Sequence, residues 1–389
     1  MIATAQRIQQ VEEYYFSRKM REIRQLLDEG KPIINLGIGS PDLPPSAMVT
    51  KALKEALDQP TAVSYQSYQG IPRLNENFKE FFTHQFKIGG DLASMPLLGS
   101  KKGITDISLA YLNQDEVALV PNPGYPTYAA ATKLAEGKVN YYSLTEEHNW
   151  HPNLEELKNL IHPKVKIMWI NYPNMPTGAQ PDLQKLQAIV DMCIAHNILL
   201  VNDNPYAHIL TEKPFSIFQL KNADKVGIEL HSMSKTFNLA GCRIGFAVGK
   251  KEFLDAITKV STQMESGMFL PQQEAAATIL KTPNDWLNTQ TETYAKRRAL
   301  VWKLCDHLQL TYQKEAGGLF VWAKIKEDTR FANAENWVDS VLEKYHFFVC
   351  PGSVFGSNGA QYVRFSLCQS EAVIIECTNR VKNASLENK

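Results

Sequence analysis

The chain has 389 residues and a mass of 43.9 kDa, which predicts two or three domains at roughly 150 residues each. Apolar residues make up 44% and charged residues 21% of the sequence, values typical of globular proteins, so a disordered, collagen-like or coiled-coil chain is excluded. The 41 basic and 41 acidic residues cancel, and such a chain has no overall attraction for nucleic acid or an anionic membrane. We therefore expect neither as a partner.

The first residues and the cysteines predict a cytoplasmic location. Residues 1–20 contain no apolar segment of the kind found in signal peptides, and no apolar run approaches the roughly 18 residues that span a membrane. The six cysteines are scattered, without a CxxC pair, so free buried thiols are expected rather than disulfides. His148 and His151 have a spacing that suggests a metal site, but no third ligand stands beside them in this polar loop, and we expect no metal.

In chain order, the first elements are helical. A charged helical pattern covers Val11–Asp28 and ends at Gly30, and residues 35–46 form a loop rich in Gly and Pro. Helical periodicity follows in Met48–Leu57 and Leu74–Phe82.

From about residue 95 onward, short apolar runs alternate with helical stretches, which predicts the buried strands of a mostly parallel sheet. The runs are Pro96–Leu98, Val117–Val120, Val139–Tyr142, Val165–Ile170, Ile198–Val201, Val226–Leu230 and Ile244–Val248.

The C-terminal part of the chain has the pattern of a smaller α+β unit. A long helix is predicted over Thr289–His307, then strands at Gly318–Ile325 and Tyr362–Leu367 with a helix at Asn336–Tyr345 between them. The N-terminal 45 residues lie outside the alternating core and are expected to pack with this unit.

Several polar or glycine-rich segments follow the predicted strands. Ligands of open α/β sheets bind at the carboxyl ends of strands, so these segments should converge on one crevice. GSKKG (99–103) joins a strand to a helix start, where free N–H groups favour an anion. PNPGYPTY (121–128) is a stiff loop with two tyrosines that could lie over a flat ligand, and NYPNMPTG (171–178) contains a turn. Taken singly, each also fits a plain connection or a packed loop.

Charged residues stand at the ends of two further strands. Asp203, with Tyr206 one turn on, is costly to bury unless it is paired; a protonated ring nitrogen would be a partner, although an N-cap Asp would look the same. Lys235 ends the sequence SMSK, eight residues before Arg243. A lysine in an apolar setting can be kept partly neutral and nucleophilic, whereas most lone lysines and arginines, Arg364 included, are surface residues.

Together these segments supply an anion-binding turn, an aromatic ring, a carboxylate, an imine-forming lysine and two arginines, which are the parts that pyridoxal phosphate requires. The chain resembles the class I/II aminotransferases of the fold-type I pyridoxal-phosphate enzymes, and among them the aspartate and LL-diaminopimelate aminotransferases. The match runs in order from NLGIGSPD (35–42) to YVRFSL (362–367), and SMSKTFNLAGCRIGF (232–246) is its most specific piece.

The resemblance implies how the cofactor, pyridoxal 5'-phosphate, is held. Lys235 binds it covalently and acts as general base and acid, Asp203 pairs with the pyridine nitrogen, and Tyr206 hydrogen-bonds the ring hydroxyl. Tyr125 lies over the ring face. The residues implied for the phosphate are Ser100, the backbone of Lys101 and Lys102, Ser232, Arg243 and, from the partner subunit, Tyr65.

The resemblance also implies a substrate site and an assembly. Arg364 matches the arginine that binds the substrate α-carboxylate, with Gly39 near it, and Lys101 stands where some relatives contact a distal carboxylate. Because Tyr65 matches a tyrosine that serves the neighbouring subunit, a homodimer with shared active sites is expected.

The implied fold is α/β. A large domain of residues 46–285 carries a mostly parallel seven-stranded sheet covered by helices, and a smaller α+β domain is formed by both chain ends, residues 1–45 and 286–389.

The implied reaction moves an amino group between an L-amino acid, aspartate or another acidic donor, and a 2-oxo acid such as 2-oxoglutarate. A β-lyase or decarboxylase acting with the same cofactor is one alternative. A non-catalytic regulator that senses pyridoxal phosphate is another. Such proteins usually carry a basic DNA-binding domain, whereas here only the N-terminal 45 residues precede the core and the overall charge is neutral.

One residue departs from the family pattern. The family usually has Asn directly before Pro-Thr-Gly, where it bonds the ring hydroxyl, and here that position is Met175. Asn174 is adjacent, but it should point elsewhere if the loop keeps its register.

Overall fold

The computed structural model describes residues 2–11, 13–326, 331 and 333–386. Its larger sheet has seven strands in the order β2-β8-β7-β6-β5-β3-β4. All neighbours are parallel except β8, which runs antiparallel to β2 and to β7. The predicted α/β class with a mostly parallel seven-stranded sheet is confirmed, and each apolar run overlaps one of these strands. They are β2 (Ala93–Leu97), β3 (Val117–Asn122), β4 (Lys138–Ser143), β5 (Val165–Ile170), β6 (Leu199–Asp203), β7 (Gly227–Ser232) and β8 (Gly245–Gly249).

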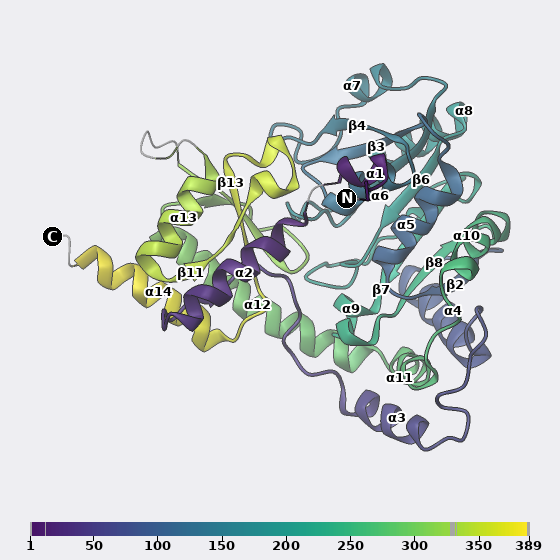
Figure 1. Cartoon of the computed structure of the whole chain (residues 1–389), viewed down its shortest axis with the longest axis horizontal. Helices are drawn as coiled ribbons and strands as arrows, with labels where there is room; N and C mark the ends of the chain where they lie inside the picture. Colours follow the sequence, from purple (N-terminus) through teal and green to yellow (C-terminus); the bar gives the residue numbers. More distant parts are fainter. Residues whose placement is uncertain (1, 12, 327–330, 332, 387–389) are drawn as a thin grey trace.

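The central strands read as continuous apolar runs because both faces of the sheet are covered by helices. In β5, Ile167 and Trp169 pack into the core on one face, while Met168 and Ile170 pack into the core on the other. Most helices of this unit lie beside the sheet in Figure 1, whereas the helix Ala47–Leu57 packs against the helix Leu270–Lys281. The helices of this unit are α3 (Ala47–Leu57), α4 (Pro72–Phe86), α5 (Ser100–Tyr111), α6 (Pro126–Leu134), α7 (Leu154–Asn159), α8 (Leu183–His196), α9 (Met233–Thr236), α10 (Lys251–Met264) and α11 (Leu270–Lys281).

The two ends of the chain meet in a second, smaller unit. Its sheet has the order β12-β13-β10-β9, and β1 pairs in parallel with β11. This pairing of an N-terminal with a C-terminal strand supports the proposed division into residues 46–285 and the two chain ends. The strands are β1 (Ile34–Asn35), β9 (Thr311–Tyr312), β10 (Phe320–Lys324), β11 (Phe347–Phe348), β12 (Cys350–Pro351) and β13 (Tyr362–Ser366), and the helices are α2 (Tyr15–Asp28), α13 (Ala334–Tyr345) and α14 (Glu371–Leu386).

The N-terminal helix begins later than predicted. The expected helix over Val11–Asp28 is α2, which starts at Tyr15, and a separate short helix, α1 (Gln6–Gln9), precedes it. Tyr14 has φ −57° and ψ 119°, which is not helical, so the chain bends at this point.

The long helix α12 (Asn284–His307) connects the two units, and Figure 1 shows it running from the large sheet toward the small one. Near its start, the indole N–H of Trp286 donates to the carbonyl of Thr236 in α9 at 2.9 Å. Farther along, α12 packs against α14 and β10. One rigid element therefore contacts both sides of the molecule. The remaining helical turns are η1 (Ile217–Gln219), η2 (Ala223–Lys225), η3 (Ala240–Cys242), η4 (Gly352–Phe355) and η5 (Ser357–Gly359).

Within the described ranges, no helix combines the length and the apolar character needed to cross a bilayer.

Candidate active site

A cavity of about 330 Å³ lies at the carboxyl ends of β6 and β7, between the two units. It is lined by most of the residues that the sequence indicates: Gly39, Ser100, Lys101, Tyr125, Asp203, Tyr206, Ser232, Lys235, Arg243 and Arg364. Two of the indicated residues, Tyr65 and Lys102, do not line it.

Lys235 lines this cavity from the short helix that follows β7. Its Nζ donates to the carbonyl oxygen of Gly39 at 2.6 Å. Burial lowers the pKa of this ammonium group, and the positive charges of Arg364 and Arg243 lower it further. A larger share of the amine is therefore neutral near pH 7, which is the form that attacks a carbonyl carbon.

Asp203 is the last residue of β6 and is buried. Its Oδ2 accepts a hydrogen bond from the phenol of Tyr128 at 2.9 Å, while its Oδ1 is buried and, among the described residues, has no partner. Burial raises the pKa of this carboxyl to about 6, against the opposing effects of the Tyr128 hydrogen bond and the charge of His231. A free carboxylate oxygen in the cavity wall suits a cationic N–H group, such as a protonated ring nitrogen.

The start of α5 and two flanking side chains form a site for an anion. The helix has 12 residues and follows Gly99, whose φ of +86° is favourable only for glycine. A Cβ at Gly99 would collide with the guanidinium of Arg243. Ser100, at the first position of the helix, lines the same cavity as Ser232 and Arg243. Free N–H groups, two hydroxyls and a guanidinium are the groups that bind a phosphate.

The structure does not support the predicted role of Lys102 in binding the phosphate. Its backbone N–H already donates to Gly99 at 3.1 Å, and its ammonium pairs with the buried carboxylate of Asp106 at 2.6 Å. Both groups are engaged in holding the first turn of α5.

Aromatic rings form one wall of the cavity. The ring of Tyr125 meets that of Tyr128 edge to face at 5.7 Å, and Tyr128 stacks on the buried Trp169 at 5.1 Å. Tyr206, which follows β6, packs edge to face on Phe320 of the small unit's strand β10, with ring centroids 5.9 Å apart. These contacts fix the rings that border a slot for a flat ligand.

Arg364 is buried on β13 and its guanidinium carbon lies 3.8 Å from the ring centroid of Phe320 and 4.6 Å from that of Phe355. Its Nη2 donates to the carbonyl of Gly37 at 2.8 Å. Its Nη1 lies 3.3 Å from the sulfur of Met175. The rings hold the guanidinium plane in one orientation, and its remaining N–H groups are suited to a carboxylate.

The turn that carries Met175 keeps Asn174 away from the cavity. The Asn174 side chain donates to the carbonyl of Asn171 at 3.2 Å and accepts from the Thr177 hydroxyl at 2.7 Å. It does not line the cavity, as the sequence register predicts. Asn171 does line it, and its side-chain oxygen accepts the N–H of Met175 at 2.6 Å.

Sequence reasoning missed several residues of this site. Tyr128 was recognised only as part of a stiff loop, although it stands one helical turn after Tyr125. The others carry no signal by themselves in the sequence, and they are Tyr14, Phe16, Asn171, Phe320 and Phe355. Tyr14 also lies against Lys101, whose Nζ is 4.6 Å from the Tyr14 ring centroid.

Tyr65 is 92% exposed and does not line the cavity of its own chain. A contribution of Tyr65 to catalysis therefore requires a second copy of the chain.

The chemistry of this cavity fits pyridoxal phosphate. It combines a depressed-pKa lysine, a buried carboxylate with one free oxygen, an aromatic slot, and a phosphate site at a helix start. Together with the mostly parallel seven-stranded sheet, these features define a fold-type I pyridoxal-phosphate enzyme.

Comparison with known proteins narrows this class. The model of the family "Aminotransferase class I and II" matches residues 31–380, so the chain belongs to this family. The LL-diaminopimelate aminotransferase of Aquifex aeolicus is 33% identical over 390 residues, 99% of this chain and 100% of that protein. The transaminase BacF of Bacillus subtilis is 33% identical over 375 residues, 95% of this chain and 94% of that protein. The apo-BacF structure, at 32% identity, superposes with a TM-score of 0.92 over 98% of both chains.

The chain is therefore an aminotransferase that uses pyridoxal 5'-phosphate. The β-lyase, decarboxylase and regulator alternatives are set aside.

Proposed function

We propose that this aminotransferase uses Lys235 as its covalent cofactor anchor and proton carrier, and Arg364 as the site for the substrate α-carboxylate. When bound, pyridoxal phosphate supplies the electron sink that acidifies the α-hydrogen of an amino acid. Lys235 would take this proton from the substrate Cα as general base and deliver it to C4′ of the cofactor as general acid. Asp203 would keep the ring nitrogen protonated, and Tyr206 would donate to the ring hydroxyl.

The observation that carries this assignment is the position of the Lys235 ammonium. It donates to the Gly39 carbonyl at 2.6 Å, and its pKa is lowered by burial and by the charges of Arg364 and Arg243, which line the same cavity. A substrate carboxylate on Arg364 would place the α-carbon close to this amine. Asp203, whose Oδ1 has no partner among the described residues, lines the same cavity, and this oxygen would accept from a protonated ring nitrogen.

For the amino donor, we favour LL-diaminopimelate over aspartate, a refinement of the acidic donor expected from the sequence. Relatives that align over nearly the whole chain are named for that substrate. Lys101 is an exposed residue that lines the cavity, and its ammonium is suited to a distal carboxylate. The cavity wall beside it is aromatic, and such a wall also accommodates the methylene chain of a long diamino acid.

An aromatic donor is the second candidate, and one observation favours it. Tyr14, Phe16, Phe320 and Phe355 all line the cavity. Rings in these positions would pack against an aromatic substrate side chain.

The active assembly that we propose is a homodimer with composite sites. Tyr65 and Val63 are 92% and 83% exposed, and Met264 and Phe269 of the α10–α11 connection are 59% and 44% exposed. A Cβ at Gly267 would touch the carbonyl of Gln66, so these two segments are adjacent. Exposed apolar side chains gathered in this way are typical of a protein interface.

The test is a panel of half-reactions followed by cofactor absorbance. Purified protein is mixed with each common L-amino acid and with LL-diaminopimelate, and the rate of the spectral change gives kcat/KM for each donor. The proposal predicts the highest value for LL-diaminopimelate. Highest values for phenylalanine or tyrosine would select the second candidate, and a highest value for aspartate would exclude both.

A further inference from the structure

We infer that Arg297 is a positioning residue, which sets the distance between the two chain segments that receive the substrate α-carboxylate. Neither Arg297 nor Asp42, its ion-pair partner, lines the cavity. Both act through the segments that do. The inference rests on the proposed role of Arg364.

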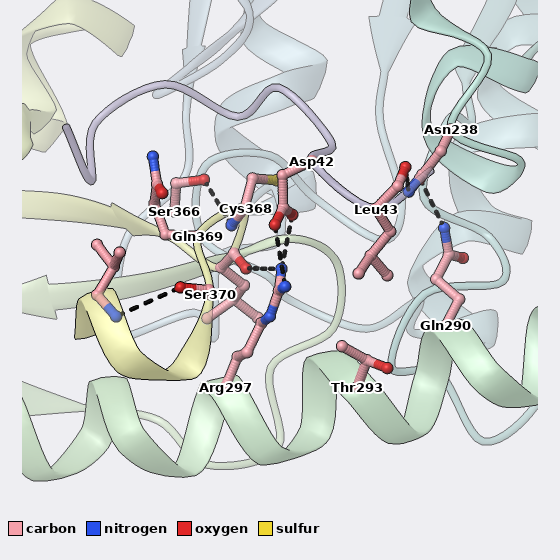
Figure 2. A network of polar contacts seen from close by, with 12 residues as sticks. Asp42, Leu43, Asn238, Gln290, Thr293, Arg297, Ser366, Cys368, Gln369 and Ser370 are labelled. Carbon is pink, nitrogen blue, oxygen red and sulfur yellow. Dashed lines mark hydrogen bonds and ion pairs between the residues drawn. The ribbon is translucent and has the colours of Figure 1, made fainter. Parts of the chain in front are cut away.

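The ion pair is well defined. Nη1 and Nη2 of Arg297 bind Oδ1 and Oδ2 of Asp42 at 2.6 and 2.9 Å, as Figure 2 shows. The Arg297 side chain is 5% exposed and that of Asp42 is 31% exposed. Two parallel hydrogen bonds between planar groups fix orientation as well as distance.

Arg297 also binds a second segment. Its Nη1 donates to the carbonyl of Leu367 at 3.1 Å. Asp42 stands three residues after Gly39, and Leu367 stands three residues after Arg364. One guanidinium therefore joins the loop of Gly39 to the end of β13, three residues after each of the two residues proposed to contact the carboxylate, Gly39 and Arg364.

The two segments also touch each other along their length. The N–H of Ser366 donates to Leu36 at 2.7 Å, and Arg364 itself donates to Gly37 at 2.8 Å. These bonds hold the start of the loop. After Gly39, the contacts of Arg297 with Asp42 and Leu367 continue the attachment. Without Arg297, the segment that follows Gly39 would lose the two hydrogen bonds made through Asp42.

The same face of α12 reaches the catalytic lysine. Seven residues before Arg297, and so two helical turns away, the Gln290 amide donates to the carbonyl of Lys235 at 2.9 Å and to the Asn238 side chain at 3.0 Å. Asn238 in turn donates to the carbonyl of Leu43 at 3.0 Å, the residue next to Asp42 (Figure 2). The helix thus ties the Gly39 loop to the lysine as well as to Arg364.

This geometry predicts a specific defect in the Arg297→Met variant. The cofactor contacts come from other segments, so cofactor affinity and absorbance should stay unchanged. Binding of any α-carboxylate should weaken, by about ten- to a hundredfold, which is the affinity that corresponds to one hydrogen bond to a charged group. The KM values of the amino acid and the oxo acid should both rise, while kcat changes by less than about threefold.

The direct measurement is the equilibrium binding of 2-methylalanine to the cofactor-loaded enzyme, followed by cofactor absorbance. This ligand has no α-hydrogen and so cannot be transaminated. Its side chain is only two methyl groups, so its affinity reports the α-carboxylate site. Arg298→Met is the matched control, since Arg298 is the next residue of α12 and donates to Ala316 at 2.6 Å. It should leave both KM values and the 2-methylalanine affinity at the wild-type level.

Milder variants test whether the defect of Arg297→Met comes from misfolding rather than from lost positioning. Asp42→Asn keeps the shape and removes the charge, and Arg297→Lys keeps the charge but cannot bind Asp42 and Leu367 in the same way. Both should show a smaller defect of the same kind. Arg297→Met combined with Asp42→Asn should be no worse than Arg297→Met alone, because the two residues act as one pair.

Arg364→Lys separates this inference from the proposed function. If Arg364→Lys leaves the binding of 2-methylalanine and the KM values unchanged, the proposed function is wrong. If Arg364→Lys weakens them but Arg297→Met does not, or if Arg297→Met instead lowers cofactor affinity or kcat at unchanged KM, the positioning role is overturned.

Discussion

The phenol of Tyr128 donates a 2.9 Å hydrogen bond to Oδ2 of Asp203, and both side chains are buried. The bond favours the charged carboxylate, whereas burial disfavours it and raises the pKa of Asp203 from 3.8 to about 6. Tyr128 therefore influences how readily Asp203 ionises, and so how well its other oxygen, Oδ1, can accept a hydrogen bond from a cation.

The first prediction follows from this bond and concerns the cofactor-free protein. A carboxyl group whose pKa is raised in the folded state makes stability fall as pH rises from 3.8 through about 6. Tyr128→Phe removes a donor to the charged form, so it raises the pKa of Asp203 and deepens this fall. The free energy of unfolding should drop by about 1.5–3 kcal/mol near pH 8, where a charged acceptor loses its donor, and by about 1 kcal/mol near pH 5.

Denaturant unfolding of wild type and variant at both pH values measures this difference. The control is Tyr142→Phe, since the buried phenol of Tyr142 donates to the carbonyl of Trp169 at 2.7 Å, and a carbonyl does not titrate. Its cost should be the same at both pH values. An equal cost for Tyr128→Phe at pH 5 and pH 8 would show that Asp203 does not titrate in this range.

The sequence predicts the strand-end residues of the site well, and the reason is physical. Both faces of a parallel sheet are buried, so its strands stand out as apolar runs, and the residue after each run lies at the ligand-binding edge. Asp203 and Ser232, the last residues of β6 and β7, were located in this way.

Residues that reach the cavity through tertiary packing could not be predicted. Phe320 is one of several buried residues in β10, and the sequence does not say which face of that strand meets the large unit. Tyr14 falls inside a continuous helical pattern, yet the chain bends there and the ring packs on Lys101. No pattern around Tyr14 indicates this contact.

The second prediction concerns the lysine. Lys235→Ala should remove the absorbance of covalently bound cofactor and lower kcat by about 10³-fold or more, since both the anchor and the proton carrier are lost. Absorbance spectra and steady-state assays of the purified variant check this. Lys251→Ala, which alters an exposed lysine paired with Asp255, is the control for purification. Near-normal turnover in Lys235→Ala would refute the assignment.

The third prediction concerns Tyr65, which is exposed in its own chain and is proposed to serve the partner's site. Tyr65→Ala and Lys235→Ala should each be inactive as homodimers. After subunit exchange, a hybrid dimer holds one site with both defects and one intact site, so activity should return to about a quarter of the wild-type value in an equal mixture.

Each variant mixed with itself is the control for this experiment, and exchange is verified with differently tagged subunits. If exchange occurs and activity stays absent, each site takes Tyr65 from its own chain or does not need it.

The fourth prediction concerns Met175, whose sulfur lies 3.3 Å from Arg364. A donor to the cofactor ring hydroxyl stabilises its anion and lowers the proton affinity of the adjacent Lys235 linkage, and methionine has no such donor. Met175→Asn should therefore lower the pH of the cofactor's spectral transition by about one unit, the shift that corresponds to one hydrogen bond.

A pH titration of the bound cofactor's absorbance measures this transition. Met175→Leu supplies no donor and should titrate like the wild type. A transition in Met175→Asn at the wild-type pH or above it would contradict the argument, because the introduced amide would then not reach the ring oxygen.

The last prediction tests the charge of Lys101, which lines the cavity beside the ring of Tyr14. If its ammonium binds a distal carboxylate, Lys101→Ala should lower kcat/KM for LL-diaminopimelate more than for alanine, by about 1–3 kcal/mol in transition-state stabilisation. Lys101→Met keeps the methylene chain on the Tyr14 ring and removes only the charge, so it should show the same selective loss. Because Lys101 also belongs to the first turn of α5, cofactor affinity is measured for both variants. Equal losses for both substrates, together with weaker cofactor binding, would reduce Lys101 to a structural part of the phosphate site.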